Sequence, residues 1–164
     1  SEGAQIATLL AERRPDLVTA AVAACGPIGD WRMQINYLGD FRLVFDAFFP
    51  GLIPGDPLNI DPAFIEGWDA YWETVIWPEL LKPANRRKVK DLLKIAYAPA
   101  QPLRYRGTVA ATVHDLLWFN IVGTNDVVEK LGGQPYDNTQ RVYGRPLRGP
   151  DVDQVVPRYT ADPE

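Results

Sequence analysis

The first three residues, Ser1-Glu2-Gly3, carry the spacing S-x-G, which could support nucleophilic chemistry. A serine at a tight turn holds its hydroxyl clear of the backbone, and a helix that follows points its N-terminal N–H groups at a developing oxyanion. In the full G-x-S-x-G device a buried strand delivers the serine to that turn. S-x-G is common by chance, but Ser1 is the only serine in the 164 residues.

The sequence after Ser1 predicts the elements that such a turn requires. Apolar residues on one helical face indicate a helix from about Gly3 to Arg14, which Pro15 stops. A short, mostly apolar run then predicts one strand, from about Val18 to Ala24, buried on both faces. Cys25 lies at its end, and we expect an inert core thiol there rather than a nucleophile.

Most of the chain resembles bacterial serine hydrolases of the α/β-hydrolase superfamily. The resemblance is carried by Ser1 to about Pro27, by Tyr37-Leu38-Gly39-Asp40-Phe41-Arg42 to Phe49-Pro50-Gly51, and by Trp118-Phe119-Asn120 to Tyr136-Asp137-Asn138. It implies the α/β class, as a partial α/β-hydrolase fold, with the residues present mainly α-helical around one core strand.

The resemblance also implies how the chain is divided. Residues 1–26 would belong to the hydrolase core, residues 27–133 would form a helical cap or lid, and residues 134–164 would be an extended loop returning towards the core. The chain would then be a fragment. The strand before Ser1, the loop with the second oxyanion donor, and the triad acid and histidine would lie outside it.

The chemistry expected from this resemblance is hydrolysis of an ester or related acyl bond, as in esterases and peptidase-like enzymes. The Ser1 hydroxyl would attack the carbonyl carbon, and the backbone N–H of Glu2 would donate to the oxyanion. Loss of one oxyanion donor typically costs about 3 kcal/mol. A fragment without the second donor and the base is therefore expected to be inactive alone.

Between residues 27 and 133 the sequence predicts at least four helices and almost no strand. Gly26 to Asp30 breaks regular structure and is the candidate boundary between core and cap. The expected helices cover about 38–49, 61–77, 84–97, 106–121 and 124–131. Asp61 is a plausible N-cap before Pro62, and a glycine follows the last helix.

Large aromatic side chains are concentrated in the first two of these helices. A cap must pack against itself and also roof the pocket, so we expect at least one of these aromatics to contact a small acyl substrate with an apolar or aromatic group. The candidates are Phe45, Phe48, Phe49, Trp68 and Trp72. Any one of them, taken alone, fits a core position as well.

Other groups that could do chemistry are better explained by structure. His114, the only histidine, lies inside an expected helix, whereas the family's histidine lies on a loop near the end of the core. The five cations between Arg86 and Lys94 fit a solvated helix face. Asp151 and Asp153 lack the further carboxylates and the glycine of a calcium loop.

Composition limits the function classes further. Lys and Arg total 17 against 21 Asp and Glu, a net charge of −4, which does not favour a nucleic-acid partner. No metal or nucleotide motif is present, so we expect no cofactor. No apolar run reaches the ~18 residues of a transmembrane helix. Without an initiator methionine the sequence leaves the compartment open.

Two alternatives remain. Ser1 could be the nucleophile of an N-terminal-nucleophile hydrolase, with its own α-amino group as the base. That architecture would begin with a strand, whereas the periodicity after Ser1 is helical. The chain could also be a non-catalytic helical binding module in which the first serine has no role.

Overall fold

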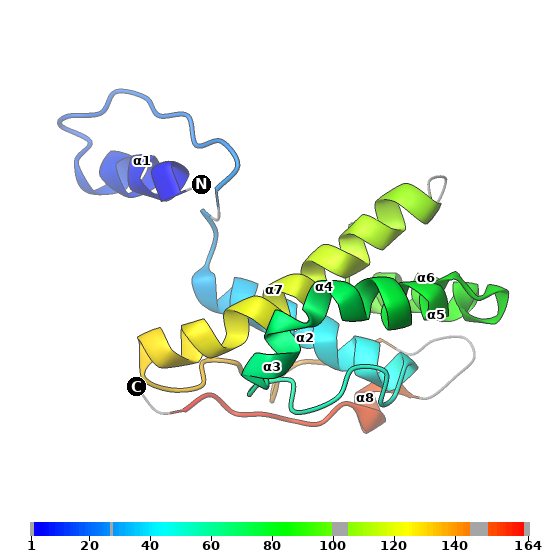
Figure 1. Ribbon diagram of the computed structural model, residues 1–164. Coiled ribbons are helices and arrows are strands. Elements are labelled where there is room, and N and C mark those ends of the chain that lie inside the picture. Colours follow the sequence, from blue (N-terminus) through cyan, green and yellow to red (C-terminus); the bar gives the residue numbers. More distant parts are fainter. Residues whose placement is uncertain (1, 27, 100–104, 145–150, 163–164) are drawn as a thin grey trace. The chain divides into compact units, whose positions relative to one another are not determined.

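The computed structural model describes residues 2–26, 28–99, 105–144 and 151–162 (Figure 1). The chain divides into two compact units, unit 1 (Ser1–Gln34) and unit 2 (Ile35–Glu164). The division falls later than the expected boundary after residue 26. The described residues are mostly helical and contain no strand, so they do not form a full α/β fold.

Unit 1 consists of helix α1 (Glu2–Arg13), a stretch without regular structure, and the first turn of α2. The predicted first helix is therefore confirmed. Its residues are mostly good helix formers, and Pro15 cannot continue it. Among its described side chains only Ala4 is buried.

The strand expected at Val18–Ala24 is wrong. This stretch has no regular structure, and the Val22 side chain is 90% exposed. A strand needs a neighbour for its backbone N–H and C=O groups, and the described residues contain none. Cys25, expected in a buried strand, is exposed and has a φ of 53°.

Helix α2 (Trp31–Phe48) is buried over its second half, from Gly39 onward. An irregular connector follows, as the prolines and glycines of residues 50–62 predict. Helix α3 (Pro62–Glu66) then begins at the expected N-cap, where the Asp61 carboxylate accepts a hydrogen bond from Ala63 N.

Helices α4 (Trp68–Tyr71), η1 (Trp72–Ile76) and α5 (Trp77–Leu81) follow one another without a break. The sequence predicted an end or a kink at Trp77-Pro78. Helical structure instead continues past Pro78, which lies in the first turn of α5 directly after the π-helical turn η1. The altered hydrogen bonding of a π turn accommodates a residue that has no N–H to donate.

A 3₁₀ turn, η2 (Pro83–Asn85), leads into α6 (Arg86–Ile95), which confirms the third expected helix. The π-helical turn η4 (Tyr105–Val109) precedes α7 (Ala110–Leu131).

Helix α7 replaces two helices that were expected at 106–121 and 124–131. Thr124 and Asn125, the polar residues at the start of the second expected helix, form hydrogen bonds that do not cap a new helix. The Thr124 hydroxyl donates to Asn120 O at 2.6 Å, and the Asn125 side chain bonds both the N–H and the C=O of Ile60. Gly132, with a φ of 73°, ends α7 in the left-handed conformation, as predicted.

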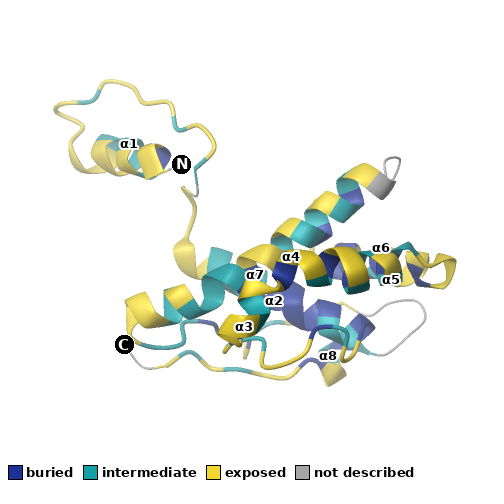
Figure 2. Cartoon of the chain, in the orientation of Figure 1, coloured by how far each residue is buried: buried dark blue, intermediate teal, exposed yellow. Residues whose placement is uncertain are grey.

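The C-terminal segment, residues 133–162 without residues 145–150, is mainly irregular and contains one short helix, α8 (Val152–Val155). Figure 2 shows the buried residues of unit 2 gathered on the inner faces of its helices. They form one hydrophobic cluster that runs from Phe41 in α2 to Val156 in the C-terminal segment.

Candidate functional site

The candidate nucleophile, Ser1, lies outside the described residues. Glu2, whose backbone N–H is the candidate oxyanion donor, is the first residue of α1. The first four N–H groups of a helix have no acceptor within it. The Glu2 N–H is therefore in a position where such a group is available to an anion.

The five candidate substrate-binding aromatics are all buried in the core of unit 2. Their exposed fractions are 0% for Phe45, 4% for Phe48, 5% for Phe49, 1% for Trp68 and 6% for Trp72. They pack against one another, with ring centroids 5.0 Å apart for Phe45 and Phe49 and 6.2 Å apart for Trp68 and Trp72. Their placement is that of core side chains.

The exposed aromatic side chains of α7 lie elsewhere. Trp118 is 37% exposed and Phe119 is 53% exposed. Their rings meet edge to face with centroids 5.2 Å apart, so they form one continuous apolar surface.

His114 lies within α7, as predicted. Its ring packs edge-on against the Trp72 ring, with the ring centroids 4.8 Å apart, and its Nδ1 lies 3.1 Å from Oδ1 of Asp115.

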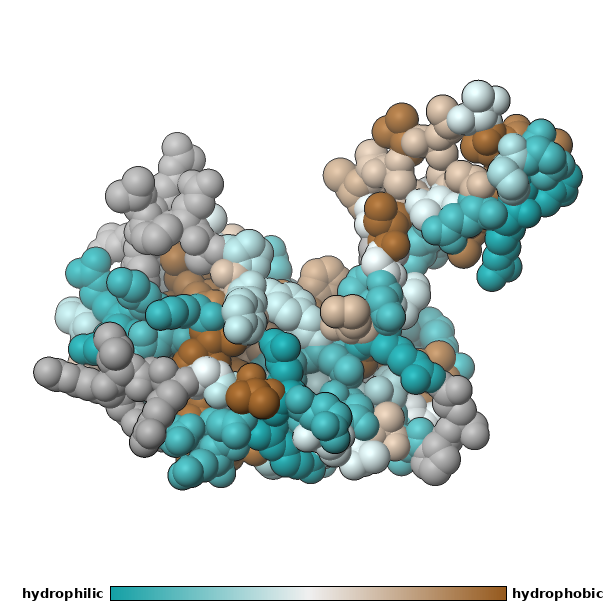
Figure 3. Space-filling model, turned by 180° about the vertical axis from the view of Figure 1, so that it is seen from behind, coloured by the Kyte–Doolittle hydropathy of each residue, from teal (hydrophilic) through white to brown (hydrophobic). Residues whose placement is uncertain are grey.

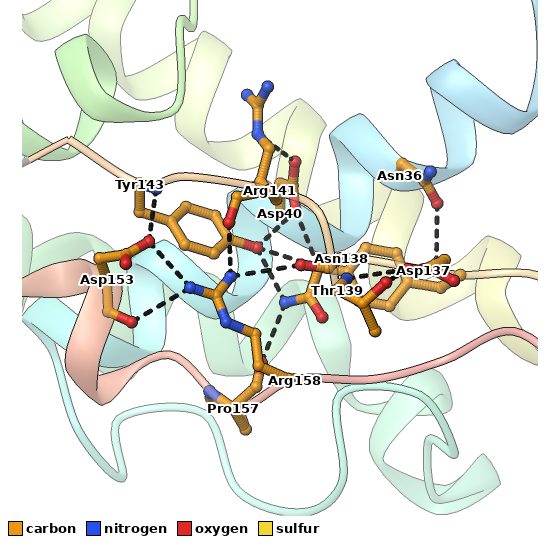
Figure 4. A network of polar contacts seen from close by, with 11 residues as sticks. Asn36, Asp40, Asp137, Asn138, Thr139, Arg141, Tyr143, Asp153, Pro157 and Arg158 are labelled. Carbon is orange, nitrogen blue, oxygen red and sulfur yellow. Dashed lines mark hydrogen bonds and ion pairs between the residues drawn. The ribbon is translucent and has the colours of Figure 1, made fainter.

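A buried polar cluster that the sequence did not predict centres on Asp40, which is 5% exposed (Figure 4). Its Oδ1 accepts hydrogen bonds from the hydroxyls of Tyr136, at 2.8 Å, and Tyr143, at 2.6 Å. Its Oδ2 lies 2.9 Å from Nε of Arg141. That N–H is not aligned for a hydrogen bond, so the contact with Arg141 is an ion pair. These contacts attach the C-terminal segment to α2.

A second layer of bonds completes the cluster. Asn138 donates from Nδ2 to the Tyr143 hydroxyl and to Pro157 O, both at 2.9 Å, and its Oδ1 accepts from Tyr159 N at 2.7 Å. Arg158 donates to Arg141 O at 2.8 Å and to the Asp153 carboxylate at 2.8 Å. The C-terminal segment is thereby bonded to itself as well as to α2.

The pKa shifts of this cluster favour a holding role over catalysis. Burial raises the pKa of the Tyr143 hydroxyl to about 12, and the hydrogen bond to Asp40 adds to the shift. Burial also raises the pKa of Tyr136, together with its bond to Tyr143 and the charge of Asp40. Both hydroxyls therefore stay neutral donors at physiological pH rather than bases or nucleophiles.

Gly39 makes room for this cluster. A Cβ at Gly39 would lie 2.4 Å from Cε2 of Tyr136, closer than any side chain allows. Gly39 therefore leaves room for the Tyr136 ring, and Asp40 beside it accepts a hydrogen bond from the Tyr136 hydroxyl.

A second buried pair lies on the same helix. The Arg42 side chain is fully buried and donates from Nε to Asp46 Oδ2 at 2.9 Å and from Nη1 to Asn120 Oδ1 at 3.3 Å. Burial raises the pKa of the Asp46 carboxyl to about 6, although Arg42 opposes the shift. Among the described residues Arg42 Nη2 and Asp46 Oδ1 have no partner, which makes this pair costly to keep.

An open hollow of about 660 Å³ lies on unit 2, where the connector, α7 and the C-terminal segment meet. Its lining includes the carboxylates of Asp56, Glu129 and Asp162 and the ring of Tyr159. Two of these carboxylates accept hydrogen bonds from backbone N–H groups, Asp56 from Leu58 N and Asp162 from Gln134 N. None of the five candidate aromatics lines the hollow.

The structure also places the remaining candidates. In the described part of the chain no group of three or more His, Cys, Asp or Glu side chains could hold a metal ion. Asp153 accepts hydrogen bonds from Tyr143 N and Arg158, and these lower the pKa of its carboxyl. Among the described helices none is long and apolar enough to cross a membrane.

Comparison with known proteins identified no relative. No family model matches the chain, and neither the curated proteins nor the solved structures contain a match to it.

Proposed function

We propose that this chain is the nucleophile turn and helical cap of a serine hydrolase that acts on ester or related acyl bonds. The observation that carries the proposal is the contrast between the two units. Unit 2 has a buried hydrophobic core beside some exposed apolar side chains, whereas among the described residues of unit 1 only Ala4 is a buried apolar side chain (Figure 3). The exposed apolar residues of unit 1 are Ile6, Leu9, Leu10, Leu17, Val22, Ile28, Trp31 and Met33. In a hydrolase core a sheet would cover many of them.

In the proposed reaction the Ser1 hydroxyl attacks the carbonyl carbon and passes its proton to a histidine that this chain does not supply. The Glu2 N–H, at the start of α1, donates to the oxyanion. His114 is given no part in the proposed reaction, because its ring packs against Trp72 and its Nδ1 lies beside the Asp115 carboxylate. An acid from outside the chain would orient the catalytic histidine.

We propose a small acyl compound with an apolar or aromatic group as the substrate. The exposed ring pair of Trp118 and Phe119 supports this choice better than the five buried aromatics do. A side chain that is nearly inaccessible contributes to stability, whereas a half-exposed ring is available for contact with a ligand.

The alternative functions have less support. An N-terminal-nucleophile hydrolase would place a strand after Ser1, but α1 begins at Glu2. A non-catalytic helical binding module fits unit 2, which has its own core. It leaves the exposed apolar side chains of unit 1 unexplained.

The test uses the intact parent protein that contains this chain. Ser1→Ala should lower kcat for p-nitrophenyl ester hydrolysis by at least about 10³-fold, because the covalent step is lost. His114→Ala, the control, should retain most of the activity. Activity that survives Ser1→Ala but is lost in His114→Ala would overturn the proposal.

A further inference from the structure

The outward face of α6 concentrates positive charge in a chain whose net charge is −4. Hydrophilic side chains gather over this helix in Figure 3. Its inward face is apolar, with Val89, Leu92, Leu93 and Ile95 buried in the core. The exposed cations of α6 and the turn before it are Lys82, Arg86, Arg87, Lys88, Lys90 and Lys94.

Few carboxylates neutralise these cations. Lys82 forms an ion pair with Glu79 and lowers the pKa of that carboxyl, and Arg87 lies 3.7 Å from Asp91. Within the described residues Lys90 and Lys94 form no ion pair, since none of the recorded pairs includes them. The face therefore retains a clear excess of positive charge.

Three of the cations lie in a row along the helix. Arg86, Lys90 and Lys94 follow one another at intervals of four residues, so they share one side of the helix and span about 12 Å along its axis. Because the opposite side of α6 is fixed in the core, binding through this row costs no folding of the helix.

We propose that this face of α6 binds an anionic lipid surface. A straight row of cations on a convex helix fits a plane of negative charge, to which each cation contributes about a fivefold gain in affinity. Single-stranded nucleic acids are instead bound in grooves with rings on which bases stack. Tyr97, an exposed ring shortly after the end of α6, already has the Arg141 guanidinium 5.6 Å from its centroid. This inference is independent of the proposed hydrolase function.

The test is co-sedimentation of the whole chain with lipid vesicles at 50 mM salt. The chain should bind vesicles of phosphatidylcholine with one third phosphatidylserine and should bind pure phosphatidylcholine vesicles weakly. The double variant Lys90→Gln/Lys94→Gln should lower binding to the anionic vesicles by roughly 30-fold, a factor of about five for each cation. Raising the salt to 500 mM should release the native chain.

The matched control removes two exposed cations elsewhere, Arg13→Gln/Lys130→Gln, and has the same net charge as the α6 variant. It should bind anionic vesicles within about twofold of the native chain. Because all four side chains are exposed, circular dichroism should show both variants folded. The inference is overturned if the two variants lose binding equally, if vesicle charge has no effect, or if single-stranded RNA binds more tightly than the anionic vesicles.

Discussion

Unit 1 and unit 2 differ in how far they bury apolar side chains and pair polar groups. In unit 2 the buried apolar side chains form one cluster, and the buried carboxylate of Asp40 has three partners. In unit 1 only Ala4 is buried among the residues of α1, and Val22 is 90% exposed. Unit 2 therefore has a buried core of its own, whereas the described residues of unit 1 bury one apolar side chain, Ala4.

This difference separates elements that form from local sequence from elements that need a neighbouring segment. Helix α1 satisfies most of its backbone N–H and C=O groups within itself, so its signal lies in the local sequence. The apolar stretch of residues 18–24 cannot form a strand alone, since its hydrogen bonds must go to another strand. The helix could therefore be predicted from local sequence, whereas the strand could not.

Among the changes considered for the two units, Asp40→Ala should lower the free energy of unfolding most. It removes the acceptor of two buried tyrosine hydroxyls and the partner of Arg141, and hydrogen bonds to charged groups contribute about 1.5–3 kcal/mol each. We expect a loss of about 4 kcal/mol in the free energy of unfolding, measured with urea. Asp126→Ala, which removes an exposed pair with Lys130, should cost less than about 1 kcal/mol. Equal losses would show that the Asp40 cluster does not hold unit 2 together.

Gly39→Ala should cost about 3 kcal/mol, since the added Cβ displaces the Tyr136 ring and its bond to Asp40. Gly123→Ala is the control within α7. No atom lies within 4 Å of a Cβ at Gly123, so it should stabilise the helix by about 1 kcal/mol. If both changes have the same sign in urea unfolding, the close approach of Tyr136 to α2 is incorrect.

The free energy of unfolding of unit 2 should depend on pH through the carboxyl group of Asp46. Its pKa is raised from 3.8 to about 6 by burial, so the folded state holds this proton more tightly than the unfolded state does. The contribution of this carboxyl to stability is fully present below pH ~4 and is lost as the pH rises through about 6.

Asp46→Asn should remove this dependence. The difference in unfolding free energy between the native chain and the variant should fall by up to about 2 kcal/mol between pH 4 and 6.5. The fall is limited to this size because the Asp46 side chain is 27% exposed to water. Urea melts at four pH values check it. An opposite slope would mean that Arg42 dominates burial at this carboxyl.

The smallest effect is expected in unit 1. Leu9→Gln replaces a side chain that is 46% exposed in α1, so it should change the unfolding free energy of unit 2 by less than about 0.5 kcal/mol. Leu117→Ala, at a fully buried position of α7, should cost about 2–5 kcal/mol. A large loss from Leu9→Gln in this chain would show that unit 1 already packs against something.

Several elements could be predicted because their signals are local. Pro15 follows the end of α1, Asp61 caps α3, and Gly132 ends α7, each within a few residues of the element it defines. The break expected before Thr124 failed because that side chain bonds back to Asn120 and α7 continues. A capping residue type is ambiguous when its side chain has another acceptor nearby.

The Asp40 cluster could not be predicted from spacing, since Asp40 and Tyr136 are 96 positions apart. One signal was present. Asp40 and Arg42 interrupt the aromatic stripe of α2, and charged residues on a buried helix face require buried partners. The sequence does not say which partners those are. Likewise, aromatic residues at helical spacing did not reveal that Phe45 and Trp68 would be fully enclosed.

The central claim is that Ser1 is the nucleophile of a serine hydrolase, and one measurement tests it most directly. The intact parent protein is treated with a fluorophosphonate probe, digested, and analysed by mass spectrometry to locate the adduct. The account predicts one modified peptide, containing Ser1, and loss of labelling in Ser1→Ala with the fold unchanged by circular dichroism. Labelling that persists in Ser1→Ala, or an adduct mapped to another residue, would contradict it.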